Sequence, residues 1–187
     1  MKKISLAVLL LASVSFATTA QAQAKNEKTV EVGGAPMYAS KNIVDNAVNS
    51  KDHTTLVAAV KAAGLVETLQ GKGPFTVFAP VNSAFDKLPE GTVASLLEPE
   101  NKTLLSSVLT YHVVAGKLDA KEIQKWMKKN SGTAELKTVQ GGKLWIMEKD
   151  GKWWIRDEKG GMAMITISDV YQSNGVIHVV DTVLMPG

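Results

Sequence analysis

Three histidines, His53, His112 and His178, are the side chains best suited to bind a metal ion or to carry a proton near neutral pH. None of them lies at a metal-ligand spacing such as H-x-x-x-H from another histidine. The chain contains no cysteine, which excludes thiolate catalysis, disulfides and cysteine-ligated zinc. The sequence therefore predicts no metal site and no cofactor.

Nucleophilic catalysis is not indicated either. No serine of the chain lies in a G-x-S-x-G motif. His178 and Asp181 are three residues apart in an expected strand, so their side chains point to opposite faces and cannot pair directly. Asp157 and Glu158 are interpreted as solvated carboxylates of a loop. We therefore expect a protein that is not an enzyme.

Two aromatic pairs are candidates for recognition instead of catalysis. Trp153 and Trp154 are neighbours in an expected strand, so they point to opposite faces, and one of them should be exposed or at an edge. An exposed indole can stack on a sugar ring or pack against a partner protein, whereas packing in the hairpin and core is the alternative. Tyr111 and His112 lie at an expected helix-to-strand junction, where both are interpreted either as buried structural residues or as direct contacts.

The N-terminus has the layout of a secretory signal peptide. Lys2 and Lys3 precede the short apolar run "ISLAVLLLASVSFA", and small residues follow at cleavage-type spacing. Cleavage after Ala22 or after Ala24 fits equally well, and an uncleaved anchor is the alternative. Residues 1–24 are therefore predicted to be a signal peptide. The protein is expected to be exported, and either periplasmic or secreted, without membrane insertion after cleavage.

Charge argues against a nucleic-acid partner. Removal of Lys2 and Lys3 leaves 19 basic and 18 acidic residues, and Arg156 is the single arginine. Nucleic-acid binders favour clustered arginine with stacking aromatics. The lysines here are spread along the chain, and the run "KWMKK" reads as a solvated helix face. We expect no nucleic-acid binding.

Hydrophobic periodicity predicts helices in the first part of the chain and strands in the last. Residues 25–39 are polar and aperiodic and are interpreted as a flexible leader. Apolar residues at helical spacing then predict helices from Ser40, from Asp52–Thr55, over 65–71, 83–88, 89–98 and 101–110, and from Asp119 to about Lys129. Short apolar or alternating runs predict strands at 75–79, near 111–114, and in four segments after Glu135, two of them joined at Asp150-Gly151. This order favours one α+β domain.

The strand at 75–79 ends at a corner with a physical explanation. Pro80 has no N–H to donate to a ladder and should end the strand. Asn82 is expected to cap the helix that follows, and Phe85 to pack that helix on the sheet. Asn174-Gly175 is expected to form a turn with positive φ, and Asp181 to accept hydrogen bonds inside its apolar strand.

Three segments occur in an order that resembles the fasciclin domain. They are "TVFAPVNSAF" (76–85), "LLSSVLTYHVVAGKL" (104–118) and "NGVIHVVDTVLMP" (174–186). The first and last match the two sequence blocks of that family, and Tyr111-His112 matches its central Tyr-His motif. Val81 departs from the threonine that is usual there. The resemblance covers residues 40–187 and treats these motif residues as structural: Phe78, Pro80, Asn82, Phe85, Asn174, Gly175, His178 and Asp181.

The resemblance implies a β-wedge of about seven strands with helices packed around it. It also implies a non-enzymatic role in cell-surface or matrix adhesion or recognition, with a protein or a glycan as partner. The candidate recognition residues are Tyr111, His112, Trp153 and Trp154. A single domain lacks the multivalency that strengthens adhesion. The chain is therefore expected to act as a recognition module or as a homodimer, and a soluble periplasmic module that binds a ligand or a protein is the alternative.

Overall fold

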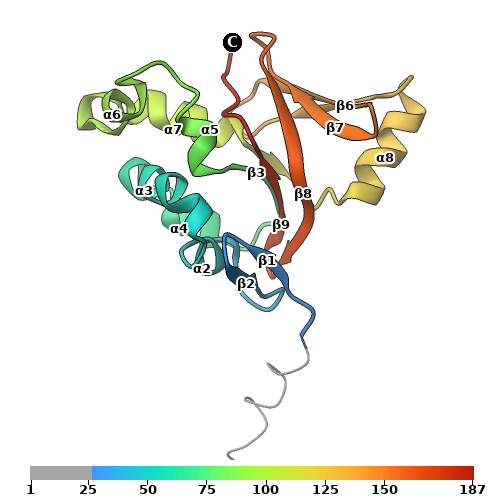
Figure 1. Ribbon diagram of the computed structural model, residues 1–187, viewed down its shortest axis with the longest axis horizontal. Coiled ribbons are helices and arrows are strands. Elements are labelled where there is room, and N and C mark those ends of the chain that lie inside the picture. Colours follow the sequence, from blue (N-terminus) through green and yellow to red (C-terminus); the bar gives the residue numbers. More distant parts are fainter. Residues whose placement is uncertain (1–26) are drawn as a thin grey trace, which may run out of the picture.

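The computed structural model describes residues 27–187 (Figure 1), so the expected signal peptide at 1–24 lies outside the described residues. The strands are β1 (Val30–Val32), β2 (Ala35–Met37), β3 (Phe75–Pro80), β4 (Val113–Ala115), β5 (Thr133–Lys137), β6 (Lys143–Lys149), β7 (Lys152–Arg156), β8 (Met162–Gln172) and β9 (Gly175–Val180). The α-helices are α2 (Ile43–Ala47), α3 (Thr54–Ala63), α4 (Val66–Gln70), α5 (Asn82–Phe85), α6 (Thr92–Leu97), α7 (Lys102–Tyr111) and α8 (Ala120–Lys129). Two 3-10 turns, η1 (Lys51–His53) and η2 (Pro99–Asn101), complete the described elements. None of the helices within 27–187 has the length and apolarity that a bilayer crossing requires.

Seven strands form one mixed sheet in the order β4-β3-β9-β8-β7-β6-β5. The β3 and β9 strands run parallel, and the other neighbouring pairs are antiparallel. The two outer strands approach each other again, because Val114 bridges Thr138 and the Val139 N–H donates to the Val113 carbonyl at 2.7 Å. The sheet is therefore nearly closed, and the predicted α+β fold with about seven strands is confirmed.

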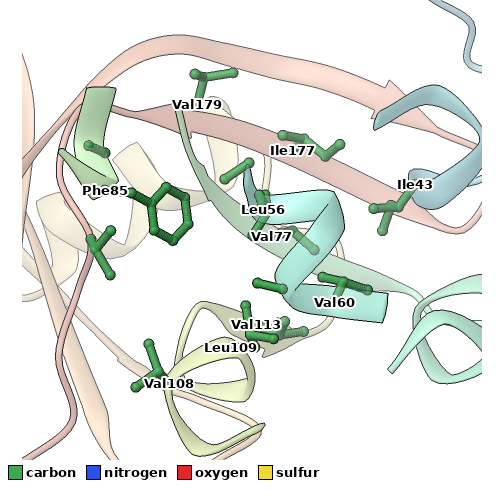
Figure 2. Packing of buried hydrophobic residues seen from close by; sticks show 14 of the residues in the cluster. Ile43, Leu56, Val60, Val77, Phe85, Val108, Leu109, Val113, Ile177 and Val179 are labelled. Carbon is green, nitrogen blue, oxygen red and sulfur yellow. The ribbon is translucent and has the colours of Figure 1, made fainter. Parts of the chain in front are cut away.

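The central strands are buried on both faces, which explains their continuous apolar sequences. One face of β3 and β9 packs under the helices, where Leu56 and Val60 of α3 lie over Val77 and Ile177 (Figure 2). The other face carries Phe78, whose ring stacks on His178 with centroids 5.7 Å apart. The molecule therefore has two hydrophobic clusters, one on each side of these two strands.

The second cluster is closed by the strands that curl back toward β4. The β5, β6 and β7 strands direct Leu136, Leu144, Ile146 and Ile155 inward, and α8 adds Ile123. Alternate residues of the same strands necessarily point outward. Helix α8 begins where predicted, since Asp119 Oδ1 accepts the Glu122 N–H at 2.9 Å. The β6–β7 hairpin also turns where predicted, with positive φ at Asp150 and Gly151 (54° and 69°).

The prediction of a flexible leader at 25–39 is wrong from Val30 onward. The β1 and β2 strands form a hairpin whose Val32 and Met37 are each 3% exposed and belong to the first cluster. The hairpin is tied to the body by the Lys51 N–H, which donates to the Gly33 carbonyl at 3.1 Å. Strands of three residues are too short to show a period in the sequence, and the polar residues before them dominate the composition.

The expected turn lies one residue earlier, at Ser173-Asn174, and the expected positive φ is wrong. Gly175 is the first residue of β9 and pairs with Gln172, and neither Asn174 nor Gly175 has a positive φ. A glycine is needed there for space, because a Cβ atom on Gly175 would lie 2.1 Å from the Phe75 carbonyl oxygen. Asn174 is buried and serves as a hydrogen-bond hub between the helices and the sheet.

The corner after β3 is confirmed in part. The β3 strand ends at Pro80, whereas its pairing with β4 extends only to Val77. Pro80 therefore has no partner in β4, and its missing N–H costs the sheet no hydrogen bond. Asn82 satisfies a helix start, but the start of α3 and not of its own helix. Its side-chain oxygen accepts the Thr55 N–H at 3.0 Å, and its amide donates to the Lys51 carbonyl at 2.8 Å.

The structure also tests the expectations for Phe85 and Asp181. Phe85 is buried in the first cluster, as predicted. Asp181 accepts the Met164 N–H at 2.8 Å and forms an ion pair with Lys87 at 3.3 Å. Burial alone would raise the pKa of the Asp181 carboxyl, but these contacts outweigh it and the pKa is lowered. Asp181 lies just after β9, and it does not pair with His178, as predicted.

Candidate recognition site

Tyr111 ends helix α7 and lies wholly inside the second cluster, with 0% of its surface exposed. Its hydroxyl donates to the Lys143 carbonyl at 2.6 Å and accepts the Glu158 N–H at 3.0 Å. Burial raises the pKa of Tyr111 to about 12. The residue therefore ties the end of α7 to β6 and to the loop after β7.

His112 is equally enclosed, at 3% exposure, and its two ring nitrogens have different roles. Nδ1 lies 2.8 Å from the Val108 carbonyl, so Nδ1 carries the proton and donates. Nε2 is then an acceptor and receives the Leu184 N–H at 2.9 Å. Burial lowers the pKa of His112 to about 4, which keeps the ring neutral and preserves this acceptor.

Two carboxylates extend the contact between the Tyr-His corner and the end of the chain. Asp157 is 3% exposed, and it accepts the Gly161 N–H at 2.6 Å and the Met185 N–H at 3.0 Å. Glu158 accepts the Gly187 N–H at 3.2 Å. The expectation that both carboxylates are solvated is thus wrong for Asp157. We call Tyr111, His112, Asp157 and Glu158 the C-terminal clamp, because the last three accept N–H groups of residues 184–187 and Tyr111 holds the backbone of Glu158.

The placement of Tyr111 and His112 does not fit a direct contact with a partner. Both side chains are buried, and every polar atom of the two has an intramolecular partner. A partner protein reaches neither ring in this conformation. We therefore assign the pair to positioning of the C-terminal segment.

The clamp makes stability depend on pH in a direction that follows from His112. Its pKa is about 4 in the folded chain and about 6.5 when unfolded, so the unfolded chain binds more protons between these values. The contribution of His112 to stability is complete above its pKa in the unfolded chain. This contribution decreases as the pH falls toward the pKa of His112 in the folded chain. The contribution of His112 should lose about 2 kcal/mol between pH 7 and pH 5.

Urea unfolding at both pH values measures this loss, and the His112→Gln variant is the control because glutamine does not titrate. Wild type should lose more free energy of unfolding than His112→Gln over this interval. The pKa values of His53 and His178 are also lowered by burial, and they contribute equally to both chains. Equal losses in the two proteins would contradict the assigned role of His112.

An aromatic and methionine surface lies on the outer face of β6, β7 and β8. It consists of five half-buried side chains, which we call the Trp–Met face: Trp145, Met147, Trp154, Met162 and Met164. They alternate along each strand with the buried residues Ile146, Ile155 and Ala163. The strand register brings them together, because Trp154 lies opposite Met147 on one side and Met164 on the other.

Charged side chains border the Trp–Met face. The guanidinium of Arg156 lies 4.9 Å from the ring centroid of Trp145, and the indole N–H of Trp145 donates to Glu135 at 3.1 Å. Lys143 forms an ion pair with Glu135 at 2.8 Å. Alternation places one acidic and five basic residues on the outer side of β5, β6 and β7: Glu135, Lys137, Lys143, Lys149, Lys152 and Arg156. The border is therefore basic.

Trp153 and Trp154, the two tryptophans predicted as recognition candidates, point to opposite faces of the sheet because they are neighbours in β7. Trp153 points to the inner side and packs against the second cluster, whereas Trp154 lies on the outer face between two methionines. Sequence reasoning missed Met147, Met162 and Met164. The alternation in "LWIM", "KWWIR" and "MAM" would have placed them on the side of Trp145 and Trp154, had the three strands been aligned.

Comparison with known proteins identifies the fold and the family. The model of the fasciclin domain family matches residues 51–186. Among curated proteins, the chain is similar to protein sll1483 of Synechocystis, with 45% identity over 93% of this chain and 90% of that protein. It is also similar to the cell surface glycolipoprotein MPB83 of Mycobacterium bovis, with 34% identity over 82% of this chain and 64% of that protein.

A solved structure has the same architecture. The domain pair of the insect cell adhesion molecule Fasciclin I superposes with a TM-score of 0.68, over 78% of this chain and 51% of that one. At 20% sequence identity this similarity shows the fold alone.

Proposed function

We infer that this chain, which belongs to the fasciclin-domain family, is an exported, non-enzymatic recognition protein that binds an acidic cell-surface or matrix protein through the Trp–Met face. Export rests on the signal-type sequence at residues 1–24. A surface or matrix setting accords with relatives such as MPB83, whose name describes a cell surface glycolipoprotein.

The observation that carries this proposal is a partly exposed aromatic cluster on the sheet. Tryptophan and arginine are enriched among the residues that dominate protein–protein binding energy. Methionine adapts its shape to an irregular partner surface. Trp145 on β6 lies directly opposite Arg156 on β7, and Trp154 precedes Arg156 by two residues. Met147 and Met164 lie directly opposite Trp154 on its two sides. This composition is typical of the centre of an interface.

The geometry favours a protein over a glycan as the partner. A sugar ring stacks on an open indole face and bonds to free polar groups beside it. Here Arg156 already lies over the ring of Trp145, and the indole N–H of Trp145 is already bonded to Glu135. Trp154 lies directly opposite a methionine on each of the two neighbouring strands. The basic border adds attraction to an acidic protein surface.

Trp154→Ser tests this proposal. The mature protein is immobilised, surface and matrix proteins of the producing cells are passed over it, and each retained protein is purified for titration. We expect Trp154→Ser to raise the Kd of an acidic partner at least about 30-fold, the effect of losing a hot spot worth roughly 2 kcal/mol. Added salt should also weaken binding, because the border is basic.

Tyr171→Ser is the matched control, since Tyr171 is an exposed aromatic residue near the far end of β8. It should leave the Kd unchanged. The proposal fails if Trp154→Ser binds as tightly as wild type. It also fails if sedimentation shows that Trp154→Ser converts a wild-type dimer into monomers and no other partner is retained, because the face then joins two copies of this chain.

A further inference from the structure

Methionines that lie near solvent are concentrated on the Trp–Met face. Three of the four partly exposed methionines in residues 27–187 belong to it: Met147 on β6, and Met162 and Met164 on β8. Met37 and Met127, by contrast, are 3% and 4% exposed and lie in the two hydrophobic clusters. The thioethers that a small solute can reach are therefore gathered at the proposed binding surface.

The strand register places two of these methionines around one indole. Met147 lies directly opposite Trp154 on one side, and Met164 lies directly opposite it on the other. Met162 lies opposite Arg156, two residues along β7. Directly opposite residues of an antiparallel pair have Cβ atoms only about 5 Å apart. A chemical change at Met147 or Met164 therefore alters the surroundings of Trp154.

The chain has no cysteine, so no thiol competes with these thioethers for an oxidant. Hydrogen peroxide converts methionine to its sulfoxide. One oxygen atom passes to Sδ as the O–O bond breaks, the sulfur is oxidised by two electrons, and water leaves. Reductases that draw two electrons from a dithiol remove the oxygen again as water, so the change is reversible. The product is polar where the thioether was apolar, and this disrupts interfaces that are rich in methionine.

We propose that Met147, Met162 and Met164 form a site of reversible oxidation by peroxide, and that their sulfoxides weaken binding at the Trp–Met face. The loss of affinity rests on the proposed function, whereas the oxidation of the site does not. A sulfoxide oxygen that a partner covers must give up its water. The carboxylates of an acidic partner only accept hydrogen bonds, so they cannot replace that water.

Oxidation is measured first without a partner. The mature protein is treated with dilute hydrogen peroxide, and its peptides are mapped by mass spectrometry over time. Met147, Met162 and Met164 should gain oxygen before Met37 and Met127, because susceptibility follows exposure.

The indole NMR signals of the same samples show where the surface changes. The N–H signal of Trp154 should shift as the methionines are oxidised. The signals of Trp126 and Trp153, which pack against the second cluster, should stay in place because the interior is unchanged.

Partner binding is then compared between treated and untreated samples of each protein. Peroxide should raise the Kd of wild type about tenfold or more, and methionine sulfoxide reductases should restore it. In Met147→Leu/Met162→Leu/Met164→Leu, peroxide should leave the Kd at its untreated value, whatever that value is, because leucine is not oxidised. Met185→Leu is the matched control: Met185 is partly exposed but packs against the first cluster, so this variant should respond to peroxide as wild type does.

The proposal is overturned if Met37 and Met127 are oxidised as fast as the methionines of the face. It is also overturned if fully oxidised wild type binds its partner as tightly as untreated protein, or if the triple leucine variant loses affinity on treatment as wild type does. If untreated wild type retains no partner, the proposed function fails and the regulation of binding fails with it. The peptide map still decides whether the oxidation site exists.

Discussion

Replacing Tyr111 with alanine is expected to lower the free energy of unfolding by about 4 kcal/mol. The side chain is 0% exposed in the second cluster, so its loss leaves a cavity among packed residues. The Lys143 carbonyl and the Glu158 N–H also lose their shared partner. Urea unfolding of the mature protein at pH 7 measures this change.

Tyr111→Phe separates packing from hydrogen bonding. It keeps the ring and removes both bonds, so it should cost about 1–2 kcal/mol. Partner binding should be unchanged in Tyr111→Phe, because the ring lies in the interior and not on the Trp–Met face. A Tyr111→Phe protein of wild-type stability that no longer bound its partner would make Tyr111 a contact and refute its assignment to the clamp.

Replacing Asn174 with alanine is expected to cost about 3 kcal/mol, since one buried and two partly buried backbone groups lose their partners. The side-chain oxygen of Asn174 accepts the Ile43 N–H at 3.0 Å, and its amide donates to the carbonyls of Leu69 and Gly71 at 2.8 and 2.9 Å. One side chain thus joins α2, the end of α4 and the β8–β9 turn. Thermal and urea unfolding should both show the loss.

Ser173→Ala is the neighbouring control. Ser173 is exposed, and its side chain makes no hydrogen bond within the described residues. Its replacement should change stability by less than about 0.5 kcal/mol. If Asn174→Ala were as stable as Ser173→Ala, the three hydrogen bonds would not contribute to the fold.

Local signals in the sequence predicted most of the elements. Asp150-Gly151 marked a hairpin because both residues tolerate positive φ, and Asp119 marked the start of α8 because its carboxylate caps a free N–H. The apolar runs of β3 and β9 indicated buried strands. The β1–β2 hairpin was missed because its buried residues, Val32 and Met37, are too few to form a periodic pattern.

Partners far apart in the chain could not be predicted in this way. The sequence indicated that Asn82 and Asn174 are structurally important, but not which groups they bond. Asn82 bonds Thr55, which is 27 residues away, and Asn174 bonds Ile43, which is 131 residues away. Spacing carries no information about such pairs. Only the tertiary fold brings these residues together.

The candidate site was predictable in part for the same reason. Alternation along one strand separated Trp153 from Trp154. The cluster around Trp154 depends on the register of three strands, which local pattern does not define. The burial of Tyr111 and His112 depends on Leu184 and Glu158, which follow them by many residues. The family resemblance indicated the importance of this pair but not whether it is contact or core.

The most direct test of recognition through the Trp–Met face is the indole NMR spectrum of the mature protein on addition of a purified partner. The chain has four tryptophans, so the spectrum contains four side-chain N–H signals. Binding through this face should shift the signals of Trp145 and Trp154 and leave those of Trp126 and Trp153 in place. A bound partner that shifts only Trp126 and Trp153, or none of the four, would place the recognition surface elsewhere on the molecule.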